Sequence, residues 1–375
     1  MIVAYNALSL RPGVVDGGAT YSLNVLHHLP RTLPEAEHVV LARPGETRIP
    51  AASNLRVEVV PRAASTRGRL VYELAGLAGA LGRLGADLLI SPNESVPRRC
   101  PCPVLVIAQN VVYHCGWEPA AFLGASARVR LGARAQAAYY RRRMPSAYRR
   151  AAAVVAVSEH AATLLEARAG LDRARTSVVP SGSDSFLLPD PPEVPRRECV
   201  LAVGALAPHR SLPATLAVFA ELRRRQPALE LVLAGGDWRG YRAVVEAEIE
   251  RLGLRDSVEV AGAVPAERLV ELYASSAALL HLSSCESFGL PLVEAMRYGL
   301  PVVAAAHGPS AEIAAGAAVL VDPTDPVAAA AEVGALLASA EQLEERRRRG
   351  RARAAKLTWE RTAAGIADAA RTIVA

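Results

Sequence analysis

The sequence predicts an α/β protein built from two doubly wound, parallel-sheet domains in tandem. Three observations support this fold class. Short apolar runs of strand type alternate with helix-type stretches along most of the 375 residues, a pattern typical of parallel βαβ units. A proline-rich segment without periodicity, residues 185–199, interrupts the alternation. The alternation then starts again, so we expect two separate domains.

The first half opens with a predicted strand over residues 1–8 and a helix over 18–29. Residues 69–85 are predicted to form a second helix, and residues 121–150 a largely helical, very basic stretch. The further predicted strands lie at 37–43, 55–60, 87–91, 103–110 and 151–158.

The second half shows the same alternation, and no shorter internal repeat is evident. Its predicted strands lie at 199–206, 229–236, 257–262, 277–283, 301–307 and 317–323. Its predicted helices lie at 211–225, 241–254, 265–276 and 292–299, with two more helices closing the chain. Ligands of such sheets bind at the carboxyl ends of the strands, so we expect a site in the cleft between the domains.

The proline-rich segment sets the predicted domain boundaries. They are 1–187 for the N-terminal domain, 188–198 for the linker, 199–356 for the C-terminal domain and 357–375 for a C-terminal helix. Whether that last helix crosses back to the N-terminal domain stays open at this point.

Composition and charge narrow the classes of protein. With 51% hydrophobic and 21% charged residues, the chain can bury large cores. Its apolar runs are far shorter than the ~20 residues that span a bilayer. The net charge of +6 suits nucleotide phosphates, an acidic membrane surface or nucleic acid, without choosing among them. The five cysteines lack zinc-like spacing and the start lacks signal-peptide features, so we expect reduced thiols and a cytoplasmic protein.

One short stretch carries the chemistry: "CESFGLPLVEAMRYGLPVV", residues 285–303. Pro291 suits the first position of a helix, because its missing N–H costs nothing there. The backbone amides of residues 287–290 would then gather at a helix N-terminus, which is a ready anion site. Glu294 falls one turn into the helix, where its carboxylate can accept hydrogen bonds from the two hydroxyls of a ribose. Glu286 precedes the turn and would meet another part of the ligand.

Two simpler roles for these acids suit the stretch less well. A hydrolase pair holds its carboxylates about 5 to 10 Å apart across one bond, whereas eight residues of helix cover about 12 Å. Either glutamate alone would be an ordinary surface or helix-start acid. The intervening Phe-Gly-Leu-Pro and the following "GLPVV" strand favour a ligand site over both of these roles.

The motif resembles the signature of retaining nucleotide-sugar glycosyltransferases of the GT-B fold, glycosyltransferase family 4, also called group 1. Weaker similarities occur in the family's order along most of the chain. They are "VVAVSEH" at 154–160, "VVPSGSDSFLLP" at 178–189, "AVGALAPHRSL" at 202–212, "LVLAGG" at 231–236, "VEVAGAVPAERLVELYASSAALLHLSS" at 258–284 and "LTWERTA" at 357–363. The resemblance implies two Rossmann-like domains facing across a cleft, with the acceptor bound by the N-terminal domain and the nucleotide sugar by the C-terminal one.

Site residues follow from this resemblance, position by position. Glu286 and Arg210 are the expected catalytic residues, with Arg210 in place of the usual diphosphate-binding lysine, and Glu294 is expected to bind the ribose. The other expected donor-binding residues are Ser287, Phe288, Gly289, Leu290, Gly204 and Gly235. The expected acceptor or transfer region comprises Gly17, Gly18, Gln109, Asn110 and Tyr113, with Trp117 also available to stack on a ring. Taken alone, Gly17 and Gly18 are equally well a simple strand-to-helix turn.

The chain departs from the family pattern at three positions. Ala205 stands where an arginine is frequent. Gln109 stands where many members carry a histidine, and a glutamine can orient a hydroxyl but cannot act as a general base. Cys285 is expected to be a buried thiol.

The implied activity is that of a hexosyltransferase, EC 2.4.1.-, which moves a sugar from a nucleotide diphosphate to an acceptor hydroxyl by front-face substitution. The expected nucleotide is UDP or GDP, no cofactor is needed, and no Asp-x-Asp spacing implies a metal. Such a reaction depends on cations and amides that stabilise the departing phosphate. A nucleotide-sugar 2-epimerase, for which only His114 and Glu118 are available here, and a non-catalytic GT-B subunit are the alternatives.

The basic helix within residues 127–150 allows two interpretations. It could lie on an anionic membrane, as a peripheral contact at the inner face. A solvated helix face with Tyr139 and Tyr140 packed inward is favoured. Nucleic acid is not expected as a partner, because no recognition motif accompanies the charge. The acceptor, which is a natural product, a glycan or a lipid carrier, and the oligomeric state stay open.

Overall fold

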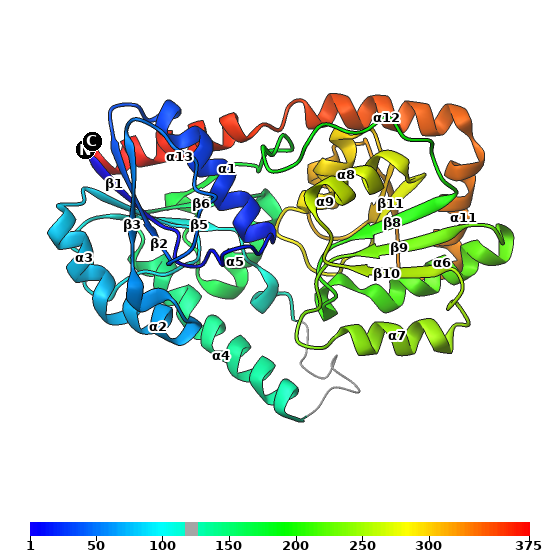
Figure 1. Ribbon diagram of the computed structural model, residues 1–375, viewed down its shortest axis with the longest axis horizontal. Helices are drawn as coiled ribbons and strands as arrows, with labels where there is room; N and C mark the ends of the chain where they lie inside the picture. Colours follow the sequence, from blue (N-terminus) through cyan, green and yellow to red (C-terminus); the bar gives the residue numbers. More distant parts are fainter. Residues whose placement is uncertain (117–126) are drawn as a thin grey trace. The chain divides into compact units, whose positions relative to one another are not determined.

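The computed structural model describes residues 1–116 and 127–375, and the chain divides into two compact α/β units (Figure 1). Unit 1 comprises Met1–His114, Tyr139–Ser185 and Thr358–Ala375. Unit 2 comprises Cys115–Ala138 and Phe186–Leu357. Residues 115–138 group with unit 2 although they precede the proline-rich segment, and the last helix, whose placement the sequence left open, groups with unit 1.

Unit 1 contains a seven-stranded sheet in the order β3-β2-β1-β4-β5-β6-β7, and each strand runs parallel to its neighbours. The strands are β1 (Ile2–Asn6), β2 (Glu37–Ala42), β3 (Leu55–Val59), β4 (Leu88–Ser91), β5 (Val104–Ala108), β6 (Ala153–Ala156) and β7 (Thr176–Val178). The chain order reverses between β1 and β4, which makes this pair the topological switch point of the sheet. Strands β4 and β5 are buried at every residue, as expected for central parallel strands covered on both faces.

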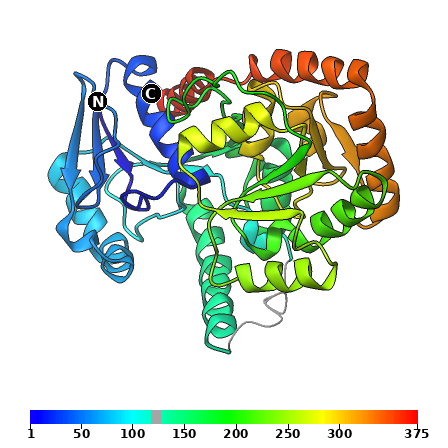
Figure 2. The same ribbon diagram turned by 45° about the vertical axis from the view of Figure 1, so that its right-hand side comes forward.

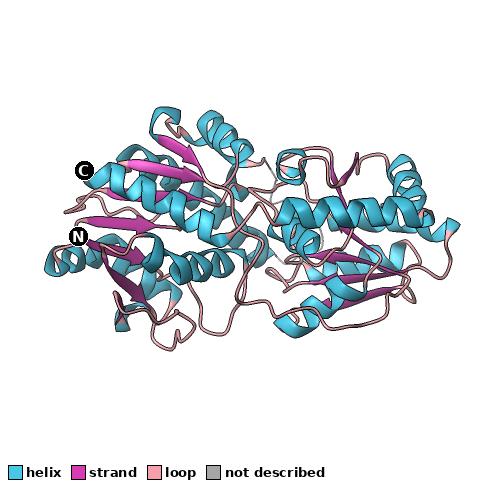
Figure 3. Ribbon diagram, turned by 90° about the horizontal axis from the view of Figure 1, so that it is seen from above, coloured by secondary structure: helices cyan, strands magenta, loops and turns pink. Residues whose placement is uncertain are grey.

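Helices flank the sheet of unit 1 (Figure 3). They are α1 (Gly17–Thr32), α2 (Thr66–Val71), α3 (Leu77–Leu84), α5 (Glu159–Ala169) and α13 (Trp359–Val374), with the short turns η1 (Pro61–Ala63), η3 (Val112–His114) and η5 (Arg173–Arg175). The predicted helix over 69–85 is broken by a π turn, η2 (Tyr72–Gly76). The first half of helix α4 (Ala127–Arg150), up to Ala138, groups with unit 2, and its second half, from Tyr139, groups with unit 1.

The C-terminal helix α13 is part of the core of unit 1, where it packs on α1. Trp359 is fully buried, and its ring lies edge-on to Tyr21 with centroids 5.5 Å apart. The Trp359 amide donates to the Asp184 carboxylate at 2.8 Å. Gly182 lies against the Trp359 backbone so closely that a Cβ would collide with it. These contacts account for the grouping of the last 18 residues with unit 1.

Unit 2 contains a six-stranded parallel sheet in the order β10-β9-β8-β11-β12-β13. Its strands are β8 (Cys199–Val203), β9 (Glu230–Ala234), β10 (Val258–Gly262), β11 (Ala278–His281), β12 (Val302–Ala305) and β13 (Val319–Val321). Its helices are η6 (Pro208–Arg210), α6 (Leu212–Arg225), α7 (Arg242–Arg251), α8 (Ala266–Ser275), α9 (Leu290–Arg297), α10 (Ser310–Ala314), α11 (Pro326–Ala338) and α12 (Ala340–Ala354) (Figure 2). The switch point lies between β8 and β11. Predicted and observed strands of this half agree in number and order.

A buried apolar cluster holds unit 2 together between the sheet and α6, α7 and α11. Phe219 and Leu216 of α6 and Leu231 and Leu233 of β9 are among its buried members. No helix in the described part of the chain is long and apolar enough to cross a bilayer.

Candidate functional site

Helix α9 begins at Leu290, one residue before the predicted start at Pro291. Gly289 is its N-cap with φ of 93°, a left-handed conformation that favours glycine, and Pro291 lies in the first turn. No side chain from the described residues caps this end. A Cβ at Gly289 would also come within 3.2 Å of the His281 ring nitrogen. The helix start therefore presents backbone N–H groups and the positive end of the helix dipole.

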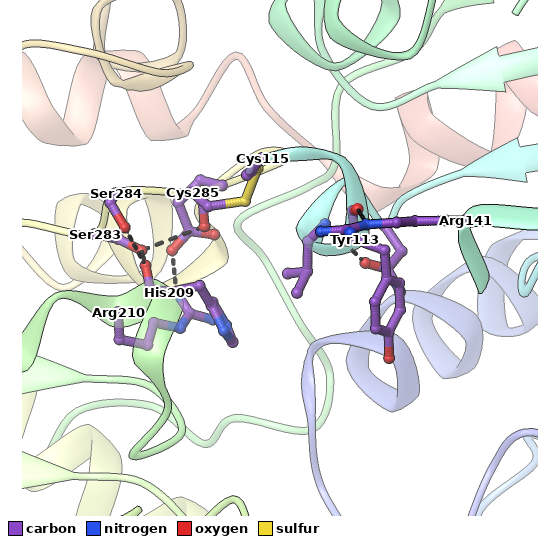
Figure 4. Close-up of a disulfide and its surroundings, with 11 residues drawn as sticks. Tyr113, Cys115, Arg141, His209, Arg210, Ser283, Ser284 and Cys285 are labelled. Atoms are coloured by element: carbon purple, nitrogen blue, oxygen red, sulfur yellow. Dashed lines mark hydrogen bonds and ion pairs between the residues drawn. A yellow bond between two sulfur atoms is a disulfide. The ribbon is translucent and has the colours of Figure 1, made fainter. Parts of the chain in front are cut away.

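The loop between β11 and α9 is tied to η6 of the same unit (Figure 4). The His209 carbonyl accepts three hydrogen bonds: from the Ser283 hydroxyl at 2.8 Å, the Ser284 amide at 3.1 Å and the Ser284 hydroxyl at 3.2 Å. These bonds hold Arg210, the next residue, beside the loop that carries Glu286.

Arg210 and Glu286 form a largely buried ion pair, and the Glu286 carboxylate lies 3.2 Å from Nε2 of His281. Burial alone would raise the pKa of Glu286, but the charge of Arg210 and the hydrogen bond from His281 lower it to about 2. Burial, and then the Arg210 charge, lower the pKa of His209 to about 4. At neutral pH the cluster therefore holds an ionised carboxylate, a guanidinium and a neutral His209.

Gly204 and Gly235 follow β8 and β9 at the carboxyl edge of the sheet, where the absence of a side chain leaves space for neighbouring groups. A Cβ at Gly235 would collide with the Gly204 carbonyl, and a Cβ at Gly204 would come within 3.0 to 3.3 Å of the Arg210 side chain. A cavity of about 20 Å³, the size of a water molecule, is lined by Gly204, Arg210, His281 and their neighbours. The two glycines thus let Arg210 lie against the end of the sheet.

Glu294 is buried one turn into α9, and Oη of Tyr273 in α8 donates to its Oε2 at 2.9 Å. Tyr273 stacks on Tyr298 with ring centroids 5.6 Å apart, and the Tyr298 hydroxyl donates to the Pro189 carbonyl at 2.8 Å. Burial raises the pKa of Glu294 to about 7, while the Tyr273 hydrogen bond acts in the opposite direction. Sequence reasoning missed Tyr273, because the contact joins two helices and no spacing rule announces it.

The expectation that all cysteines are reduced is wrong for two of them. Cys285 is paired with Cys115 in a disulfide between residues 170 positions apart (Figure 4). Their Cα atoms are 5.8 Å apart, a separation that a disulfide can bridge. Cys100, Cys102 and Cys199 are free thiols. The disulfide anchors the residue directly before Glu286, so Cys285 is not the unpaired buried thiol predicted.

We expect Cys115→Ser to lower the melting temperature under non-reducing conditions, because the cross-link restricts the unfolded chain. For a loop of this length the chain-entropy contribution is at most about 5 kcal/mol. A reductant should lower the melting temperature of the unmodified protein and leave that of the variant unchanged. Cys100→Ser, at a free thiol, is the matched control. Rapid alkylation of both Cys115 and Cys285 in native, unreduced protein would contradict the pairing.

The residues expected in the acceptor region all belong to unit 1. Gly17 and Gly18 form the first turn of α1, which Asp16 caps by accepting from the Ala19 amide at 2.9 Å. This placement matches the simple strand-to-helix turn that the two glycines equally well predict. The remaining residues of that group, Gln109, Asn110 and Tyr113, follow β5.

These three side chains have partners within unit 1. Gln109 donates to the Pro92 carbonyl at 2.7 Å, and the Asn110 side chain accepts from the Val112 amide at 3.1 Å. Tyr113 is buried and stacks on Tyr140, with centroids 4.5 Å apart, so one face of its ring is already covered. Trp117 and Glu118 lie outside the described residues.

Metal ligation has no candidate within residues 1–116 and 127–375, where no group of three or more His, Cys, Asp or Glu side chains is placed to hold an ion. His281 was also missed as a neighbour of Glu286, although its place in the apolar run "AALLHLS" was a visible signal. A polar residue at the carboxyl end of a buried parallel strand points to a ligand edge.

Two family models match the chain in succession. Residues 15–185 match the model described as glycosyltransferase family 4, and residues 187–354 match that described as glycosyl transferases group 1. The two matches together cover most of both units. The fold is GT-B, and the chain belongs to the group 1, family 4 glycosyltransferases.

Curated relatives carry glycosyltransferase names. A D-inositol 3-phosphate glycosyltransferase of Segniliparus rotundus is 36% identical over 46% of this chain and 39% of its own length. One from Nocardia farcinica is 33% identical over 57% of this chain and 51% of its own. An O-antigen chain mannosyltransferase B of Escherichia coli is 32% identical over 43% and 42%. The chain thus spans about half or less of the length of these relatives.

Solved structures agree in fold along nearly the whole chain. A sucrose-phosphate synthase from Thermosynechococcus elongatus superposes with a TM-score of 0.75 at 18% identity, covering 99% of this chain and 98% of the other. HepE of Anabaena in complex with UDP and glucose gives 0.69 at 17%, covering 99% and 100%. At these identities the likeness concerns the fold alone.

Proposed function

We propose that this protein is a retaining glycosyltransferase that moves a sugar from a nucleotide-diphosphate donor to an acceptor hydroxyl. The observation that carries the proposal is the grouping, within unit 2, of the start of α9, which no described side chain caps, with the Arg210–Glu286 pair. A cation and a set of backbone amides at one place suit a diphosphate. Relatives named as glycosyltransferases and a structural neighbour in complex with UDP and glucose support the same donor class.

Each donor-binding residue has a proposed role. Arg210 exchanges part of its contact with Glu286 for diphosphate oxygens, which it can hold through two N–H groups at once. The amides of Ser287 to Leu290 face the same phosphates, and Glu286 turns toward the sugar. Glu294 accepts hydrogen bonds from the ribose. Gly204 and Gly235 let the chain approach the donor without side chains in the way.

The proposed mechanism is front-face substitution, in which the leaving diphosphate oxygen helps to take the proton of the acceptor hydroxyl. The bond from the anomeric carbon to the phosphate oxygen breaks as the bond to the acceptor oxygen forms on the same face. Arg210 and the helix start stabilise the charge that develops on the departing phosphate. No strong side-chain base is required, which suits the presence of Gln109.

Acceptor binding is assigned to unit 1, with Gln109, Asn110 and the first turn of α1 as the transfer region. The names of the relatives, which include D-inositol 3-phosphate glycosyltransferases and a mannosylfructose-phosphate synthase of Agrobacterium fabrum, favour a polyhydroxylated acceptor. A cytoplasmic location, with the basic face of α4 at a membrane surface as an option, belongs to the same proposal.

A thermal-shift screen of UDP, GDP, ADP and dTDP sugars tests the function. A true donor should raise the melting temperature, because at a hundred times its dissociation constant it adds about 2.7 kcal/mol to the free energy of unfolding. The matching nucleoside monophosphate is the control, because it lacks the diphosphate that Arg210 would hold. Slow hydrolysis of the stabilising donor would separate an enzyme from a binding subunit. If no nucleotide sugar stabilises the protein at millimolar concentration, the proposal fails.

A further inference from the structure

A second polar cluster lies in unit 1, at the carboxyl edge of its sheet. The residues of the cluster belong to four neighbouring strands, in the order β3-β2-β1-β4, or to the segments that follow them. Asn6 ends β1, Arg43 directly follows β2 and Asn93 lies just after β4, while Arg69 and Glu73 lie further along the chain after β3, in α2 and η2. The cluster therefore flanks the switch point between β1 and β4, where doubly wound sheets bind their ligands.

The cluster is buried and partly linked by hydrogen bonds. Asn6 and Glu73 are 0% and 2% exposed, and Arg43 is 6% exposed. The Asn93 side-chain amide donates to Oε1 of Glu73 at 3.0 Å, and the Asn6 amide approaches Oδ1 of Asn93 at 3.5 Å. Glu73 also lies in a π turn, an irregularity often found at functional sites. The carboxylate is thus held in place by its neighbours.

Arg69 has a donor that the surrounding protein does not accept, and Arg43 lies close enough to add to the positive charge. Arg69 has 11% of its side chain exposed, its Nε has no acceptor among the described residues, and its nearest approach to Glu73 is 3.8 Å. Arg43 donates through Nε to the Leu8 carbonyl at 2.7 Å. Burial, followed by the charge of Arg69, lowers the pKa of Arg43, and Glu73 only partly offsets both effects. The buried hydroxyl of Tyr139 in α4 also has no hydrogen-bond partner among the described residues.

Two buried cations therefore face one carboxylate. A buried charge without a full set of hydrogen bonds is destabilising, and a ligand oxygen that accepts from both arginines would remove that destabilisation. Phosphate and carboxylate groups match the fork of a guanidinium. A neutral sugar hydroxyl would leave the excess positive charge uncompensated.

We propose that Arg43 and Arg69 bind an anionic group, phosphate or carboxylate, of the substrate that unit 1 accepts. The inference rests on the proposed function in calling that substrate the acceptor, but anion binding itself can be tested without any donor. Glu73 lies beside the anion and limits its affinity, while Asn93 keeps Glu73 turned toward Arg69. The exposed Arg67, on the same helix as Arg69, takes no part.

The test is calorimetric titration of the full chain with inorganic phosphate, glucose 6-phosphate, glucuronate and, as the neutral control, glucose. We expect saturable binding of the anions and none of glucose, with glucose 6-phosphate and glucuronate deciding between the two anionic groups. Arg69→Gln should weaken anion binding more than about tenfold, the worth of a charge-assisted hydrogen bond. Arg67→Gln is the matched control and should bind as the unmodified protein does.

Glu73→Gln separates binding from folding damage, because it keeps an acceptor for Asn93 and removes the competing negative charge. It should bind phosphate several-fold more tightly, a gain that a damaged fold would not produce. If Arg69→Gln unfolds at a lower temperature than the unmodified protein, the phosphate affinities of Arg69→Lys and Glu73→Gln test the inference instead. Unchanged phosphate affinity in Arg69→Gln or Arg69→Lys, or weaker affinity in Glu73→Gln, would overturn the inference. Loss of nucleotide-sugar binding alone would instead count against the proposed function, since donor binding is assigned to unit 2.

Discussion

Arg210→Ala is expected to lower the turnover of sugar transfer about 10²- to 10³-fold, the loss seen when one donor to a developing oxyanion is removed. Arg210 is the last residue of η6 and is held beside the Glu286 loop by the hydrogen bonds at the His209 carbonyl. The variant loses a cation where negative charge develops on the departing phosphate. It also removes the charge that lowers the pKa of Glu286 most, so this pKa should rise from about 2. Steady-state rates with saturating donor measure the effect.

Two further variants control that experiment. Arg210→Lys keeps the charge and loses the two-pronged donor, so its turnover should fall between those of the unmodified protein and Arg210→Ala. Arg224→Ala removes an exposed arginine of the same unit, paired with Glu221 on the surface, and should leave turnover unchanged. An Arg210→Ala protein that keeps its melting temperature and its turnover would refute the assigned role.

Local chemistry explains why the start of α9 could be predicted from sequence. Gly289 takes a positive φ and Pro291 occupies the first turn, and both preferences belong to the residues themselves. The parallel sheets could be predicted for a similar reason, since continuous apolar runs such as β4 and β5 are buried at every residue.

Contacts between distant segments could not be predicted. Tyr273 reaches Glu294 from another helix, and Cys115 meets Cys285 across 170 positions, because tertiary packing alone decides both. Predictions about cysteine use the spacing of the cysteines and the redox state of the compartment. Neither of these shows which thiols lie close together in the folded protein. The placement of α13 in unit 1 depends on Trp359 fitting against Gly182, which no local pattern reveals.

Glu294→Ala is expected to raise the dissociation constant of the nucleotide sugar more than about tenfold, since two hydrogen bonds from ribose hydroxyls to a carboxylate are lost. Glu286→Ala, in contrast, should mainly lower turnover. Calorimetric titration of the donor measures the first effect, and titration of the 2′-deoxy nucleotide is the control, since it lacks one of the two hydroxyls and should lose less on substitution. Unchanged donor affinity in Glu294→Ala would contradict the ribose assignment.

The Glu294 carboxylate should also make donor affinity depend on pH. Burial raises the pKa of Glu294 to about 7, so the empty protein holds it protonated below that pH and ionised above it. Because the carboxylate is the better acceptor of hydroxyl protons, donor affinity should fall as the pH drops through about 7. Tyr273→Phe removes the hydrogen bond that favours the ionised form, so it should move the midpoint of the affinity profile to higher pH. A midpoint that stays in place, with affinity lowered equally at all pH values, would mean that Tyr273 only packs against Tyr298 and does not control the charge of Glu294.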